Sequence, residues 1–194
     1  MKKLLSLSLC LFMLLSFSFF GCNNLGEKES FKKSKLTKYI EDNEIATIWG
    51  APNTVSIMKD LDVKTQCDFW GEEWLDSADK IHVEGLKGDV EATQIMITAK
   101  SKIKSFDLKA DDLVAQDGSK IEKTNIEVLA ERYIETINPS SQSNTASMFT
   151  GWFPDAVVPI NSYKMRRENV VEADENQGIW VNISIPTDSK AGLY

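Results

Sequence analysis

The sequence has little of the chemistry on which most enzymes depend. It contains one histidine, His82, and a single imidazole cannot build a histidine-rich metal site. It contains no GxSxG, CxxC or HExxH motif and no phosphate-binding glycine loop. We therefore predict no catalytic residue, no metal site and no cofactor in this chain. His82 is interpreted as a solvated or hydrogen-bonded residue of a strand.

Cysteine is also scarce, with three residues in the chain. Cys10 lies in an apolar N-terminal segment that we expect to be removed, and Cys22 is expected to carry lipid. Cys67 would then be the one remaining thiol, which excludes an internal disulfide. We interpret Cys67 as a small buried apolar residue rather than a nucleophile.

Basic residues are outnumbered, 22 against 29 acidic residues, which gives a net charge of −7. Loss of the first 21 residues would remove Lys2 and Lys3, leaving 20 basic residues and a net charge of −9. Nucleic-acid binding needs a basic surface, so we exclude nucleic acid as a partner. The same charge argues against a protein that lies flat on anionic lipid.

The N-terminus has the order of a targeting segment. Lys2 and Lys3 precede an apolar run over residues 4–20, and Gly21-Cys22 follows. This order resembles the lipobox of bacterial lipoproteins. The resemblance implies that Cys22 becomes the mature N-terminus and carries diacylglycerol and an acyl chain such as palmitate. An ordinary secretory signal or an uncleaved anchor are the alternatives, and all three place the remaining chain outside the cytoplasm, in the cell envelope.

We accordingly divide the chain into a signal peptide (1–21), a lipid-anchored polar tether (22–43) and a folded domain (44–194). Alternating apolar and polar residues predict strands within residues 44–49, 54–58, 79–85, 91–99, 102–109, 124–137 and 179–186. Asp117-Gly118 predicts a tight turn, and a bulge is expected in 124–137. No long helical period separates these segments, so the prediction is an all-β antiparallel sandwich.

Two groups of loop aromatics are the candidate binding residues. Trp70 and Trp74 lie in one predicted loop, and Trp152 and Phe153 lie in another. Indole rings beside acidic residues can stack on the apolar face of a sugar, although burial in a core or interface is the favoured reading. The paired acids at 72–73 and 111–112 are interpreted as solvated surface, because neighbouring strand residues point to opposite faces.

Several motifs over 44–194, taken in order, resemble the N-terminal β-sandwich of glycoside hydrolase family 123 and its uncharacterised relatives. They are a G-x-x-E-x-x-Q strand, a P-D-x-x-x-P segment and a closing N-Q-x-x-W-V motif that leads into P-x-D-x-x-x-G-x-Y. The matching positions are Gly88, Glu91, Gln94, Pro154, Asp155, Pro159, Asn176, Gln177, Trp180, Pro186, Asp188, Gly192 and Tyr194.

The resemblance implies a two-part enzyme in which the sandwich supports a (β/α)8 barrel. In that family the barrel carries an Asp-Glu pair that cleaves β-linked N-acetylgalactosamine with help from the substrate's acetamido group. Such a barrel needs about 250 residues, so we expect the chain to stop before it and one strand short of a full sandwich. The chain is thus predicted to be a non-catalytic module. The alternative is a free lipoprotein that binds a glycan or another protein.

Overall fold

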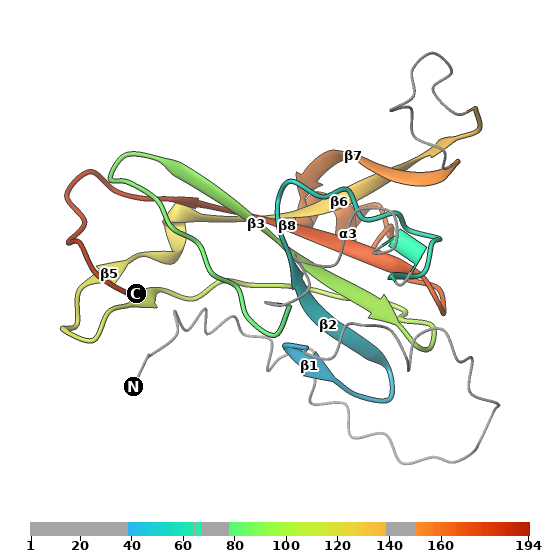
Figure 1. Cartoon of the computed structure of the whole chain (residues 1–194), viewed down its shortest axis with the longest axis horizontal. Helices are drawn as coiled ribbons and strands as arrows, with labels where there is room; N and C mark the ends of the chain where they lie inside the picture. Colours follow the sequence, from blue (N-terminus) through green and yellow to red (C-terminus); the bar gives the residue numbers. More distant parts are fainter. Residues whose placement is uncertain (1–38, 64, 67–77, 139–149) are drawn as a thin grey trace.

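A computed structural model describes residues 39–63, 65–66, 78–138 and 150–194. Six strands form one antiparallel sheet in the order β1-β2-β3-β8-β6-β7 (Figure 1). They are β1 (Glu41–Asp42), β2 (Ala46–Ala51), β3 (Val90–Ala99), β8 (Asn176–Ser184), β6 (Ile126–Thr136) and β7 (Gly151–Pro159). The all-β prediction is confirmed. The described fold begins at Tyr39, before the predicted boundary at Glu44.

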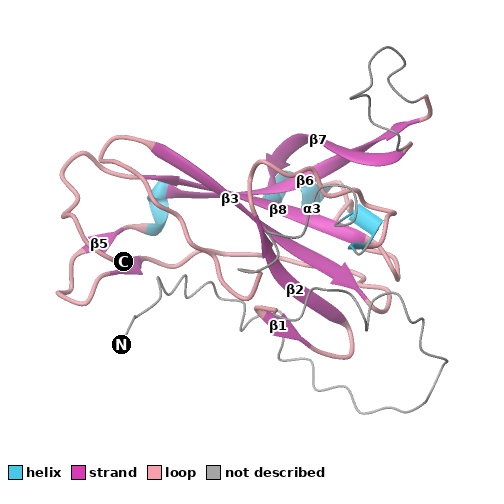
Figure 2. Ribbon diagram, viewed as in Figure 1, coloured by secondary structure: helices cyan, strands magenta, loops and turns pink. Residues whose placement is uncertain are grey.

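One face of the sheet packs on the main apolar core. Alternate residues of β3 and β8, such as Ile95 and Ile179, point into this core, as the period of two requires. It is covered by the short sheet of β4 (Leu113–Val114) and β5 (Lys120–Ile121) and by extended segments that contribute Phe106 and Leu108. Among the described residues, the second layer of the sandwich is therefore a two-stranded sheet plus extended chain rather than a broad sheet (Figure 2).

Three predicted strands are wrong. Residues 54–58 and 79–85 contain no strand, and 102–109 holds only an isolated bridge from Ile103 to Val171. Residues 54–58 resemble a strand because Val55 and Ile57 alternate with polar residues in the sequence, and Ile57 and Met58 are buried. Side chains of Gln94 and Gln66, rather than a neighbouring strand, bond the Val55 carbonyl and the Met58 N–H. An alternating sequence pattern therefore does not by itself distinguish a strand from a covering loop.

The sequence-based prediction missed β7 and expected the bulge on the wrong strand. β7 was not predicted, and its Pro154 and Pro159 are tolerated because β7 is the edge strand. The expected bulge lies at the β6–β7 pairing, where Arg132 faces Ala156 and Tyr133 faces Pro154. The extra residue is therefore Asp155, on β7. Helix α3 (Ile160–Met165) follows directly, and a 3-10 turn, η3 (Lys123–Asn125), precedes β6.

None of the helices in the described residues is long and apolar enough to cross a membrane.

Candidate functional site

The second face of the sheet is covered by residues 52–63 and 65–66 and carries buried polar side chains. Trp49 and Met96 from the sheet pack there against Ile57 and Val63 from the covering loop. The backbone of this loop cannot pair with a strand across a face, so its polar groups need other partners. Side chains of the sheet, and one side chain of the loop itself, supply several of them.

Asn176, at the start of β8, holds the middle of the loop. Its Nδ2 donates to the carbonyl oxygens of Met58 and Leu61, each at 2.9 Å. Its Oδ1 accepts a hydrogen bond from Thr98 Oγ1 at 2.8 Å, and Thr98 Oγ1 in turn accepts one from Trp49 Nε1 at 3.0 Å. This chain of bonds fixes the loop to three strands of the sheet.

Two glutamines bond further backbone groups of the loop. Gln94 Nε2, from β3, donates to the carbonyls of Pro52 and Val55, both at 2.8 Å. Gln66 accepts from the Met58 N–H at 2.8 Å and donates to the Leu61 carbonyl at 2.7 Å. Both glutamines are almost fully buried, so they act on the scaffold rather than on a ligand.

β6 and β8 stop pairing at Ala130 and Ile179, while β6 continues beside β7 as far as Thr136. Side chains connect the strands beyond this point. Gln177 Nε2 donates to the Glu131 carbonyl at 2.9 Å, and the Gly178 N–H donates to the Tyr133 hydroxyl at 2.9 Å. These hydrogen bonds, which involve side chains, connect the diverging strands where the backbone ladder between β6 and β8 has ended.

Glu131 is buried in this divergence, with 3% of its surface exposed. No described residue hydrogen-bonds its Oε2. Burial raises the pKa of Glu131 from 4.5 to about 7, and the hydroxyl of Tyr133 offsets part of that rise. The pKa of Tyr133 is raised well above its usual value by burial and, secondarily, by the charge of Glu131. Glu131 is therefore a buried acid whose pKa lies near neutrality.

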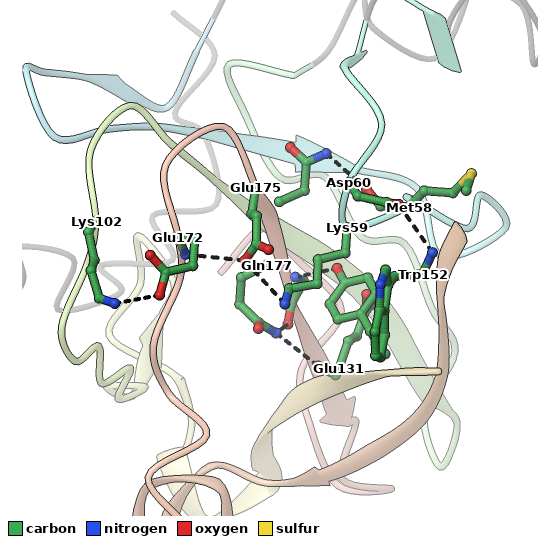
Figure 3. Close-up of polar contacts among 12 residues, drawn as sticks. Met58, Lys59, Asp60, Lys102, Glu131, Trp152, Glu172, Glu175 and Gln177 are labelled. Atoms are coloured by element: carbon green, nitrogen blue, oxygen red, sulfur yellow. Dashed lines mark hydrogen bonds and ion pairs between the residues drawn. The ribbon is translucent and has the colours of Figure 1, made fainter. Parts of the chain in front are cut away.

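A hollow of about 230 Å³ opens beside this region. Figure 3 shows Lys59 between Glu175 and the ring of Trp152. The Lys59 Nζ lies 3.1 Å from Glu175 Oε2 and 5.6 Å from the centre of the Trp152 ring. The lining residues are Lys59, Arg132, Tyr133, Trp152, Tyr163, Glu168 and Val170.

Of the predicted binding residues, the structure places one at this hollow. Trp152 lines it and is 37% exposed. Phe153 follows Trp152 in β7, so its side chain points to the other side of the strand. Trp70, Trp74 and the lipidation site Cys22 lie outside the described residues, as do Cys67 and the acids at 72–73.

The other acids and the histidine have ordinary surroundings. His82 is exposed and lies 2.9 Å from Glu84. Asp112 accepts a hydrogen bond from the Lys123 N–H at 3.0 Å. Within the part of the chain that the structure describes, no three His, Cys, Asp or Glu side chains are grouped to hold a metal ion.

Comparison with known proteins identifies the family. The model of the glycoside hydrolase 123 N-terminal domain matches residues 72–194. The chain belongs to this family. The resemblance predicted from the sequence is confirmed. No curated protein sequence matches the chain.

A solved structure of a family 123 glycoside hydrolase from Clostridium perfringens, analysed for the details of glycolipid glycan hydrolysis, is also similar to the chain. The two are 21% identical, with a TM-score of 0.39, over 56% of this chain and 17% of the other. The chain therefore covers less than a fifth of that enzyme's length.

The residues that carry the family resemblance have structural roles in this domain. Gln94 and Asn176 hold the covering loop, and Gln177 joins the diverging strands. Gly88 has a φ of 88° in the turn before β3, a conformation that favours glycine. Tyr194 is buried in the main core, and its hydroxyl donates to the Lys190 carbonyl at 2.9 Å.

Sequence reasoning missed Lys59, Arg132, Glu131 and Tyr163. One signal was available for Glu131. It is two residues from Leu129 and from Tyr133, so the strand period places a carboxyl on a face with two large, less polar neighbours. The positions of Lys59 and Tyr163 depend on how the covering loop and helix α3 pack against the end of the sheet. No local sequence pattern predicts this packing.

Proposed function

We propose that this chain is the non-catalytic N-terminal β-sandwich module of a glycosidase-like protein, anchored in the envelope by lipid on Cys22. The observation that carries the proposal is the use of the family's polar residues. Gln94, Asn176 and Gln177 are buried and bonded to the backbone of the domain itself. Side chains occupied in this way support a scaffold and are not free to meet a substrate.

The acidic residue that lines the hollow also supports a non-catalytic role. Glycoside hydrolysis usually needs two carboxyl groups on either side of the scissile bond. Glu168 is the one carboxylate among the described residues that line the hollow, and its Oε1 lies 3.4 Å from Arg132 Nη2. An ion-paired acid with no second acid among the described lining residues is poorly suited to proton transfer to a glycosidic oxygen.

In this proposal a (β/α)8 barrel, as in the family resemblance, supplies catalysis on β-linked N-acetylgalactosamine. The sandwich supports that barrel, and the lipid holds both parts outside the cytoplasm. A mature charge of −9 would keep the domain surface away from anionic lipid. Several acyl chains on Cys22 would make the attachment stable, because a single chain binds only marginally.

Immunoprecipitation from source cells tests this proposal. An antibody against residues 78–138 is used on detergent-solubilised membranes, and the precipitate is assayed with 4-nitrophenyl β-N-acetylgalactosaminide. We expect the antigen in the membrane fraction and hydrolysis by the precipitate. Antigen recovered only from the soluble fraction, or a membrane precipitate without this activity, would contradict the proposal.

A further inference from the structure

Trp152 is held in place although more than a third of the residue is exposed. Its backbone N–H donates to Asp60 Oδ1 at 3.1 Å, and its backbone carbonyl accepts from the Lys59 N–H at 2.9 Å. The Lys59 carbonyl then accepts from the Asn176 N–H at 2.8 Å, which ties the start of β7 to the start of β8. The Lys59 ammonium lies over the ring itself. A ring held from its backbone and from one face loses little entropy when a ligand binds.

Both cations beside the indole have an anionic partner. Lys59 is paired with Glu175 at 3.1 Å, and Arg132 is paired with Glu168 at 3.4 Å. The Asp60 carboxylate, which accepts from the Trp152 backbone, is a third anion, so these groups leave no positive charge to attract an anionic ligand. Each pair keeps unused hydrogen-bonding capacity, because an ammonium has three donors, a guanidinium five and a carboxylate several lone pairs. The rim can therefore both donate to and accept from a neutral ligand.

The size of the hollow restricts the ligand further. Pockets for drug-sized molecules span roughly 300–1,000 Å³, and this hollow has about 230 Å³. It fits one small unit rather than an extended chain. A ligand that combines an apolar face for an indole with hydroxyl groups that donate and accept is a neutral sugar.

We propose that the hollow binds one neutral sugar residue, stacked on Trp152 and hydrogen-bonded by Arg132 and Glu168. This inference goes beyond the scaffold role, because it assigns a ligand to the module itself. It holds whether the module works beside a barrel or alone. Sugar-stacking is thereby assigned to Trp152 together with the Lys59 loop and α3, and not to the pair of Trp152 with Phe153.

The test is saturation-transfer NMR on the purified full chain, with the methyl β-glycosides of N-acetylgalactosamine and galactose and with glucuronic acid as an anionic comparison. We expect saturable transfer to at least one neutral glycoside and weaker transfer to glucuronic acid. Trp152→Ala should weaken binding at least tenfold. Trp180→Phe, which alters an indole on β8 outside the hollow, should leave it within twofold.

A second variant covers the case in which Trp152→Ala unfolds the edge strand. Arg132→Ala retains the indole and removes the hydrogen-bonding rim, and it should weaken binding at least threefold with an unchanged melting temperature. Three results would overturn the inference: no saturable transfer, stronger binding of glucuronic acid, or equal binding by all variants. Hydrolysis of a glycoside would instead contradict the proposed function and leave the binding result intact.

Discussion

The carboxylate of Glu131 lies directly against the backbone of Gly178. A Cβ built at position 178 would overlap Glu131 Oε2, which is the nearest atom to it. The contact occurs where β6 and β8 stop pairing, and the Gly178 N–H is bonded there to the hydroxyl of Tyr133. The absence of a side chain at 178 therefore makes room for a buried acid between two strands.

Gly178→Ala should destabilise the domain by about 1–3 kcal/mol, because the added methyl group has to displace Glu131 or the backbone. Urea unfolding measures the change. Gly192→Ala is the matched control, since a Cβ at 192 meets no atom within 4 Å, and its unfolding free energy should change little. Equal effects of the two substitutions would contradict the packing described for Gly178.

Glu131→Gln should change how stability depends on pH. The pKa of Glu131 is raised from 4.5 to about 7 on folding, so the folded state binds more protons than the unfolded state between these values. Stability should therefore fall as pH rises through this window, by up to about 3 kcal/mol from this group. The glutamine variant cannot ionise and should lack that part of the loss.

Urea unfolding of both proteins at pH 4 and pH 8 checks this prediction. The difference in unfolding free energy between Glu131→Gln and the unmodified chain should shift in favour of the variant as pH rises. The contributions of the other titrating groups cancel in that difference. A difference that stays constant with pH would show that Glu131 is not perturbed in the folded state.

Asn176→Ala should cost about 3 kcal/mol, because the buried carbonyls of Met58 and Leu61 lose their donor. Asn182→Ala on the same strand is the control. Asn182 bonds Trp180 and Glu127 near the surface, where water can replace it, and its loss should cost under about 1 kcal/mol. Chemical denaturation distinguishes the two. If Asn182 costs as much as Asn176, the loop is not held as described.

Cys22→Ala should abolish lipid attachment if Cys22 is the modified residue. Cells labelled with radioactive palmitate should incorporate label into the unmodified chain, and fractionation should place that chain with membranes. Cys67→Ala is the matched control and should retain both label and location. Label that persists in Cys22→Ala would show that another residue carries the lipid.

The sequence predicted the all-β class because burial in a sheet leaves a period of two, and β3, β6 and β8 show it clearly. It also predicted the family, because the motifs that contain Gln94 and Asn176-Gln177 occur in the order and at the spacing seen in that family. One of its errors has a clear cause. Residues 54–58 alternate like a strand because they cover a sheet face, but Gln66 and Gln94 bond their backbone in place of a neighbouring strand, and Gln94 is far away in the sequence.

The candidate site was less accessible to sequence reasoning. Trp152 was identified because an aromatic residue in a predicted loop is conspicuous. Lys59 and Arg132 were not identified, because nothing in the sequence around either residue indicates that residues 58–60 lie against the start of β7. The alternation of residues in β6 indicated that Glu131 shares a face with Leu129 and Tyr133. Only the divergence of β6 from β8 explains why a carboxyl group can lie there.

The most direct test of the account is an assay of the purified 194-residue chain with 4-nitrophenyl β-N-acetylgalactosaminide. The account predicts no release of nitrophenol above the buffer rate, because the family's residues in this chain support a scaffold. Hydrolysis that co-purifies with the chain and is lost in Glu131→Gln or Glu168→Gln would contradict it, and would place a catalytic acid in the sandwich itself.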